Sequence, residues 1–126
     1  MTPYERRPPV LSRMTRDSGI VVVSIIGELD TANTREIEPA FSAALPDRRV
    51  RAIVDLSGVP FLTSAALAMF VVQAQAMRRA GGDLRLAALQ PRVADIFERA
   101  GFSVIFPIYS TLDEAIAELE GKKLGE

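Results

Sequence analysis

Two adjacent hydroxyl side chains, Thr63 and Ser64, stand directly ahead of an apolar run in the stretch PFLTSAALAMF, residues 60–70. A hydroxyl can act as a nucleophile, cap a helix or accept a phosphate. Nucleophilic catalysis needs a base to activate the hydroxyl, but the 126-residue chain has no histidine and no lysine near these positions. A serine-hydrolase site is therefore excluded, and the helix cap and the phosphate acceptor remain as alternatives.

The composition narrows the class of protein further. Fifteen basic residues stand against sixteen acidic ones, which disfavours nucleic-acid binding through a basic face. The absence of cysteine and histidine excludes disulfides and thiolate metal sites and removes the commonest metal ligand. No apolar stretch reaches the roughly 20 residues of a membrane span, and the first residues lack the apolar region of a signal peptide. We expect a cytoplasmic protein that is not an enzyme and holds no metal or cofactor.

Hydrophobic periodicity predicts strands that alternate with helices along most of the chain. The strands are predicted at residues 10–16, 20–27, 50–56, 83–89 and 102–109. Helices are predicted over residues 63–80, 90–101 and 110–120, and over an earlier segment with apolar residues from Ile37 to Leu45. Thr31, Asn33 or Thr34 could cap that earlier helix, and Asp30 and Asn33 are turn or cap residues in the simplest interpretation. Pro39 lies inside it and should kink it or delay its regular start.

This order, β-β-α-β-α-β-α-β-α, predicts a single α/β domain at residues 10–120. Crossover connections require a mostly parallel sheet, here of about five strands with about four helices. The turn sequence Asp17–Gly19 allows the first strand to pair antiparallel at an edge. Residues 1–9 are expected to form a flexible lead-in and residues 121–126 a solvated tail. The state of association is open between a monomer and a weak dimer, since an exposed first strand could pair two copies.

Four strings in register resemble a known family. They are GELDTAN (residues 27–33), VDLSGVPFLTSAALAMF (54–70), GGDLRLAAL (81–89) and AGFSVIFPIYSTLDEAI (100–116). Together they resemble the STAS domain of bacterial anti-sigma-factor antagonists over nearly the whole chain. The resemblance implies a STAS-like fold for the domain.

The resemblance also implies a role in transcription regulation by partner switching. In such proteins the unmodified antagonist binds an anti-sigma factor, commonly a serine/threonine kinase, which then releases its sigma factor. The kinase phosphorylates a hydroxyl residue at the start of the helix that corresponds to TSAALAMF, and a PP2C-type phosphatase removes the phosphate. The implied partners are therefore proteins, with no nucleic acid and no membrane.

The residues at the helix start depart from the family's usual string, Asp-Ser-Ser-Gly-Leu, and come closer to a subgroup that reads Ser-Ser-Ala-Gly-Leu. This chain reads Thr63-Ser64-Ala65-Ala66-Leu67. Against the usual string, the phosphorylated serine falls on Ala65, which cannot be modified. Ser64 is therefore the first candidate for phosphorylation and Thr63 the second.

A partner-binding surface is expected around these hydroxyls. Its candidate residues are Asp30, Thr31, Asn33, Ser57, Gly58, Val59, Phe61 and Leu62. An apolar rim of Val59, Pro60, Phe61 and Leu62 would contact the kinase, and a phosphate beside it would repel the kinase by charge and desolvation. This interpretation requires that the start of the helix lies at the surface, beside the loop after Leu29.

Two other functions stay open at this point. Ala65 and Ala66 could mark a lost switch in a non-phosphorylated STAS subunit, which serves as a docking part of a transporter or a signalling scaffold. A third alternative is a small-molecule or nucleotide sensor, although the pattern indicates close packing without a pocket.

Overall fold

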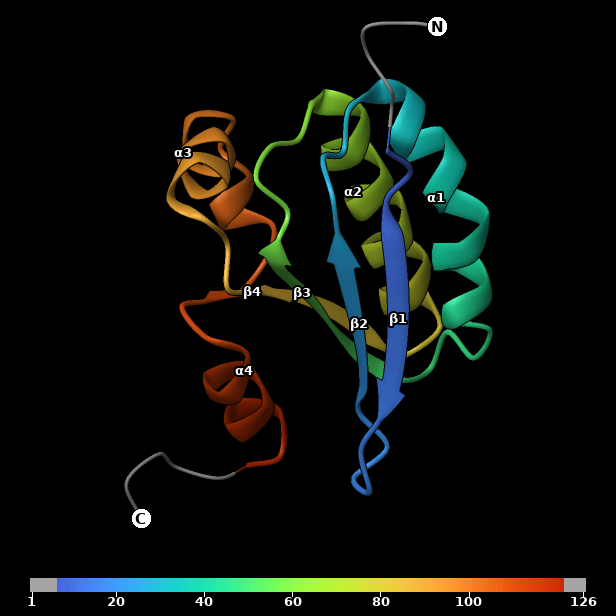
Figure 1. Cartoon of the computed structure of the whole chain (residues 1–126). Helices are drawn as coiled ribbons and strands as arrows, with labels where there is room; N and C mark the ends of the chain where they lie inside the picture. The colour runs from blue at the N-terminus through green and yellow to red at the C-terminus, as the bar shows by residue number, and fades with distance from the viewer. Residues whose placement is uncertain (1–6, 122–126) are drawn as a thin grey trace, which may run out of the picture.

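The computed structural model describes residues 7–121 and contains one five-stranded sheet with helices on both faces (Figure 1). The strands lie in the order β1 (Val10–Thr15), β2 (Val21–Ile26), β3 (Arg51–Gly58), β4 (Asp83–Ala87) and β5 (Ile108–Tyr109). The helices are α1 (Thr31–Ala44), α2 (Ser64–Arg79), α3 (Pro91–Arg99) and α4 (Leu112–Leu119), with a short 3₁₀ turn, η1, at Phe102–Val104. Of the predicted lead-in only residues 7–9 are described, and of the predicted tail only Gly121.

The predicted sheet topology is confirmed. β2, β3, β4 and β5 are parallel, and β1 pairs antiparallel with β2 at the edge. A tight turn makes this hairpin possible: Gly19 takes a φ of 89°, and its N–H donates to the carbonyl of Arg16 at 2.8 Å. The hairpin is tied to the C-terminal end of α4, because the Arg16 guanidinium pairs with Glu120, the C-cap of that helix, at 2.8 Å.

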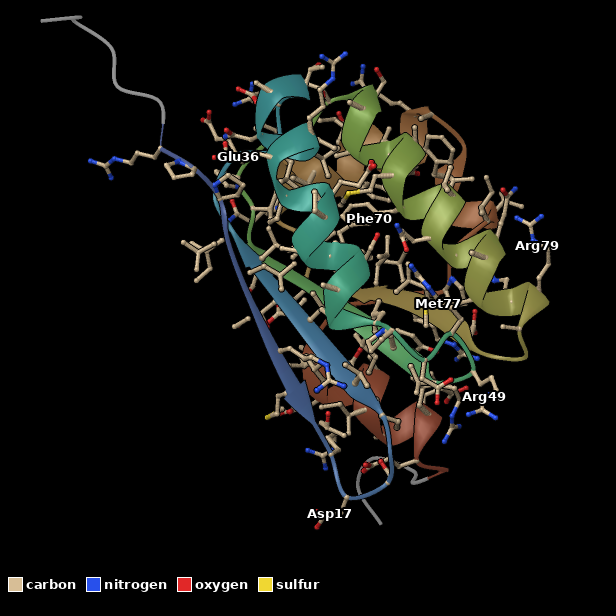
Figure 2. All side chains as sticks on the ribbon, turned by 90° about the vertical axis from the view of Figure 1, so that its right-hand side faces the viewer. Asp17, Glu36, Arg49, Phe70, Met77 and Arg79 are labelled. Carbon is tan, nitrogen blue, oxygen red and sulfur yellow. The ribbon has the colours of Figure 1, made fainter. Side chains whose placement is uncertain are left out.

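The two faces of the sheet bury different cores. Val21, Val23 and Ile25 of β2 face the larger core, which includes α1 and α2. There the rings of Phe41 and Phe70 meet edge to face at 5.9 Å, and Figure 2 shows Phe70 in the space between the two helices. The opposite face packs against α4 in a smaller core around Ile20, Val22, Ile53, Ala87, Ala115, Ile116 and Leu119.

The predicted last strand is wrong over most of its length, since only Ile108 and Tyr109 join the sheet. The N–H groups of Ile105 and Phe106 both donate to the Phe102 carbonyl, at 3.0 and 3.1 Å. These local hydrogen bonds form a turn and leave those donors unavailable to a strand ladder. The Phe102 ring packs against Phe97 of α3, which fixes the turn beside that helix.

The start of α1 also differs from part of the expectation. The helix begins at Thr31 and continues through Pro39, so Pro39 does not delay its start. Its N-cap is Asp30, whose Oδ1 accepts the Asn33 N–H at 2.7 Å, whereas Thr31, Asn33 and Thr34 lie inside the helix. The carboxylate therefore takes the cap position that the sequence also offered to three other residues.

Candidate functional site

Two loops at the carboxyl ends of β2 and β3 form the candidate site. One connects β2 to α1 and the other connects β3 to α2, and backbone hydrogen bonds join them. The Leu29 N–H donates to the Phe61 carbonyl at 3.0 Å, and the Thr63 N–H donates to the Leu29 carbonyl at 3.1 Å. These bonds place the start of α2 beside the loop after Leu29, as the sequence predicted.

Thr63 occupies the N-cap position of α2, but its hydroxyl makes no capping hydrogen bond. The side chain is half-buried, and Oγ1 donates instead to the Leu29 carbonyl oxygen at 3.4 Å. The helix-cap interpretation therefore explains the position of Thr63 but not the use of its hydroxyl. The hydroxyl links the two loops.

Ser64 is the first residue of α2 and is exposed. Among the described residues, its hydroxyl has no hydrogen-bond partner. The first turn of α2 contains no acidic residue, while Arg78 and Arg79 lie in its last turn. The positive end of the helix dipole at Ser64 is therefore not balanced by a carboxylate of that turn.

The two alanines after Ser64 have different surroundings. Ala65 is half-exposed and lines a shallow groove between α1 and α2 with Glu38, Ala68 and Val72. Ala66 lies wholly in the larger core. A side chain at position 65 is therefore accessible, but alanine offers no group that could be modified there.

The residues predicted from the first loop divide between surface and interior. Thr31 is exposed and Asp30 is half-buried as the cap of α1. Asn33 is buried, and its Nδ2 donates to the Glu28 carbonyl at 2.9 Å. The expectation of a surface position is wrong for Asn33, because its amide is used to hold the loop that precedes its own helix.

The predicted apolar rim is wrong for two of its four side chains. Val59 and Leu62 are buried in the larger core. Pro60 is exposed and Phe61 half-buried, so these two residues form the apolar part of the surface. A run of four apolar residues in an irregular loop could not show in advance which of them point inward.

Ser57 and Gly58, the last two residues of β3, have structural roles as well. Ser57 is exposed, and its N–H donates to Asp55 Oδ1 at 3.0 Å. A Cβ on Gly58 would lie 2.8 Å from a side-chain carbon of Ile26 and 3.0 Å from the Ile25 carbonyl oxygen. Close packing against β2 therefore accounts for the glycine.

The sequence interpretation missed two residues at the start of α3 that complete this surface. The Arg92 guanidinium lies over the Phe61 ring, 4.9 Å from its centroid, and Gln90 Nε2 donates to the Ser57 carbonyl at 2.8 Å. The order of the strands in the sheet would have placed these two residues at this surface. β3 and β4 are parallel neighbours, so the segments that follow them meet at the same edge of the sheet.

The arrangement presents a hydroxyl, an aromatic ring and a guanidinium at one end of the sheet. Residues 7–121 contain no group of three or more acidic, cysteine or histidine side chains that could hold a metal ion. In the same part of the chain no helix combines the length and the apolar character that crossing a membrane requires. The prominent features are an exposed hydroxyl at a helix start and a mixed surface of Phe61, Arg92 and Thr31.

Comparisons with known proteins agree with this fold. The family model for the STAS domain matches residues 12–115. The anti-sigma-F factor antagonist RsfA of Mycobacterium tuberculosis is 28% identical over 99 residues, which cover 77% of each chain. A crystal structure of an anti-sigma factor antagonist from Mycobacterium paratuberculosis superposes with a TM-score of 0.80 at 28% identity, covering 89% of this chain and 94% of that one.

SpoIIAA of Bacillus shares the fold at lower identity. Its unphosphorylated form gives a TM-score of 0.74 at 20% identity, covering 90% of this chain and 99% of that one. Its phosphorylated form gives 0.65 at 19% identity, covering 87% and 99%. The family model spans well over half of the chain, and the protein therefore belongs to the STAS domain family, which confirms the resemblance seen in its sequence.

Proposed function

We propose that this protein is an anti-sigma factor antagonist whose binding is switched by phosphorylation at Ser64. In its unmodified form it binds an anti-sigma factor with serine/threonine kinase activity in the cytoplasm, and the anti-sigma factor releases its sigma factor. The observation that carries the proposal is the exposed hydroxyl of Ser64 at the start of α2, with no hydrogen-bond partner among the described residues. The antagonists from the two Mycobacterium species, each 28% identical, support the class of partner.

The proposed partner surface surrounds Ser64. It comprises the exposed residues Thr31, Ser57, Pro60 and Arg92 with the half-buried Asp30 and Phe61. The kinase would pack against this mixed surface while its ATP faces the Ser64 hydroxyl. Asn33, Gly58, Val59 and Leu62 support the surface from within and are not proposed as direct contacts.

Phosphorylation is the proposed off-switch. The γ-phosphoryl group of ATP bonds to Ser64 Oγ, the hydroxyl proton passes to a base of the kinase, and ADP leaves. The product carries a charge of about −1.5 to −2 at the positive end of α2, where no acidic residue of the first turn opposes it. The fold can therefore keep its structure, while a partner packed against Phe61 meets a charged and strongly hydrated group. A PP2C-type phosphatase would restore the hydroxyl by hydrolysis.

Thr63 is the weaker candidate for the same modification. Its hydroxyl is half-buried and donates to the Leu29 carbonyl, so transfer to Thr63 would break the link between the two loops. Ser64 requires no such change. We therefore place the switch at Ser64 and expect little phosphate on Thr63.

The proposal is tested by affinity capture from the native cell. We expect the wild-type protein to retain an ATP-binding anti-sigma factor, identified by mass spectrometry, and the Ser64→Asp variant to lose it. The Ser64→Asn variant, which is polar but uncharged, should retain most of the binding. A matched control is Ser103→Asp, which adds the same charge at an exposed serine in η1.

Two results would contradict the proposal. Equal capture by wild type and the Ser64→Asp variant would show that charge at this position does not control binding. Retention of a transporter ATPase or a multi-copy scaffold in place of an anti-sigma factor would favour the non-phosphorylated STAS subunit.

A further inference from the structure

β1 forms an outer edge of the sheet, and in residues 7–121 no strand pairs with its far side. Figure 1 shows β1 beyond β2, and in Figure 2, where Asp17 marks the turn of the hairpin, β1 again forms the outer edge. Six residues, Val10–Thr15, present this edge. An unpaired strand of this length is a template for pairing with another chain.

Two hydrogen bonds show which backbone groups of β1 are unpaired. The Arg16 N–H donates to the Ile20 carbonyl across the hairpin, and the Gly27 N–H donates to the Gly58 carbonyl on β3. Alternate residues of a strand direct their backbone groups to opposite sides. Because Arg16 bonds toward β2 and Gly27 bonds away from β1, the even-numbered residues of β1 direct their backbone groups toward β2. Leu11, Arg13 and Thr15 therefore direct their N–H and C=O groups outward.

The side chains beside this edge form an uncovered apolar patch. Val10 and Met14 of β1 are 60% and 50% exposed, and Ile26, which pairs with Val10, is 60% exposed. They lie on the face of the sheet that α4 covers farther along, around Val22 and Ile53. Apolar side chains next to unpaired backbone groups are the features that edge pairing uses.

We propose that β1 pairs antiparallel with β1 of a second copy, about a two-fold axis at Ser12. Only residues whose backbone N–H and C=O groups face outward can exchange hydrogen bonds with the second copy. Leu11 can therefore pair with Arg13 but not with Met14. In this register Val10 of each copy lies opposite Met14 of the other in a non-hydrogen-bonded pair, where side chains approach most closely. Val10, Ser12 and Met14 of one copy thus face Met14, Ser12 and Val10 of the other, so that each apolar side chain meets an apolar side chain.

Neighbouring registers fit less well. A shift that centres the axis on Arg13 places Met14 opposite Ser12 and Val10 opposite Arg16, so neither apolar side chain gains an apolar partner. A shift that centres it on Leu11 places Val10 opposite Ser12 and Met14 opposite Pro8, which lies outside the strand. The register about Ser12 avoids both defects and joins the two patches of Val10, Met14 and Ile26.

The usual protections of an edge strand are weak here. A charged side chain can block pairing, but Arg13 Nε donates to the Ala44 carbonyl at 2.7 Å and is folded back onto the end of α1. Pro9 limits the length of the ladder without preventing it, because its carbonyl can still accept. About six backbone hydrogen bonds would form. This contact is smaller than a standard interface of about 1,600 Å², so we expect a weak dimer.

Cysteine crosslinking tests the register. Because the chain has no native cysteine, every disulfide must form between introduced cysteines. The Ser12→Cys variant should form a disulfide-linked dimer under mild oxidation, far faster than the exposed control Ser103→Cys, since Ser12 faces its own copy across the axis. A mixture of Val10→Cys and Met14→Cys should crosslink more than either variant alone. Equal rates for Ser12→Cys and Ser103→Cys would overturn the proposal.

Sedimentation equilibrium tests the association without a crosslink. The apparent mass should rise from 13.7 kDa toward twice that value as concentration increases toward the millimolar range. The Ser12→Asp variant should shift the dissociation constant upward at least tenfold, because two carboxylates then oppose each other. The control Ser24→Asp adds the same charge on β2, one strand inward. A constant monomer mass, or equal effects of the two variants in folded protein, would refute the two-fold pairing.

Discussion

A negative charge at Ser64 should stabilise the isolated protein while it abolishes partner binding. The residue begins α2, whose first turn has no acidic side chain, so a carboxylate there meets an uncompensated helix end. The Ser64→Asp variant should therefore be more stable than Ser64→Asn, which has nearly the same shape without the charge. This pair of variants isolates the electrostatic contribution from helix propensity and side-chain size.

The size of the effect follows from the position of the charge. A carboxylate in the first turn of an exposed helix contributes about 0.3–1 kcal/mol at low ionic strength. With an m-value of about 1.5 kcal/mol per M, the urea midpoint should rise by about 0.2–0.7 M. Circular dichroism at 222 nm during urea unfolding measures this, and about 1 M salt should remove most of the difference by screening.

A positive charge at position 64 tests the sign of the electrostatic effect on stability. Ser64→Lys should lower the midpoint relative to Ser64→Asn, because it places a positive charge at the positive end of the helix. If the Asp and Asn variants unfold at the same urea concentration in low salt, or if Asp is the less stable, the assignment of Ser64 to an open helix end is wrong. The account of how the fold tolerates a phosphate would then fail with it.

Three further predictions concern the framework that positions the site. Gly82→Ala should destabilise the protein by more than about 2 kcal/mol, because the new Cβ would lie 2.3 Å from the backbone oxygens of Arg48 and Val50; urea unfolding measures the loss, and a variant as stable as the wild type would contradict the close approach. Asp30→Ala should cost about 1 kcal/mol by removing the cap of α1 and should leave the fold intact, as thermal unfolding and a circular dichroism spectrum can verify; no loss of stability would contradict the cap. Burial opposes the ionisation of Asp83, but hydrogen bonds from two arginines outweigh it and hold its pKa below the usual range. Its stabilisation should be complete above the ordinary carboxyl pKa of about 3.9 and be lost as pH falls through the lower folded-state value, so the stability gap between wild type and Asp83→Asn should shrink below about pH 4, and a gap that stays constant to pH 2 would contradict it.

Much of the fold was predictable because its signals are local and periodic. The β-branched run that ends near Ile26, the turn at Gly19 and the apolar spacing in α2 each specify an element without reference to the rest of the chain. The segment from Phe102 to Pro107 was not predictable in this way. Its apolar residues suit a strand, but contacts with α3 and a local turn determine its conformation.

The site was predictable in position but not in side-chain detail. The topology brings the loops after β2 and β3 together, so the neighbourhood of Leu29 and Thr63 followed from parallel strands. Whether Val59 points inward, or whether Thr63 uses its hydroxyl as a cap, depends on loop geometry that has no periodic signature. Arg92 could have been placed beside Phe61 from the strand order, which shows that topology can extend a motif-based interpretation.

The location of the phosphate is the most direct test of the switch. After the captured complex is incubated with ATP, peptide mass spectrometry of the antagonist measures how many phosphates are added and on which residue. We predict one phosphate, on Ser64, and none when the same reaction uses the Ser64→Ala variant. A phosphate on another residue, or an unmodified chain in a complex with an active kinase, would contradict the account.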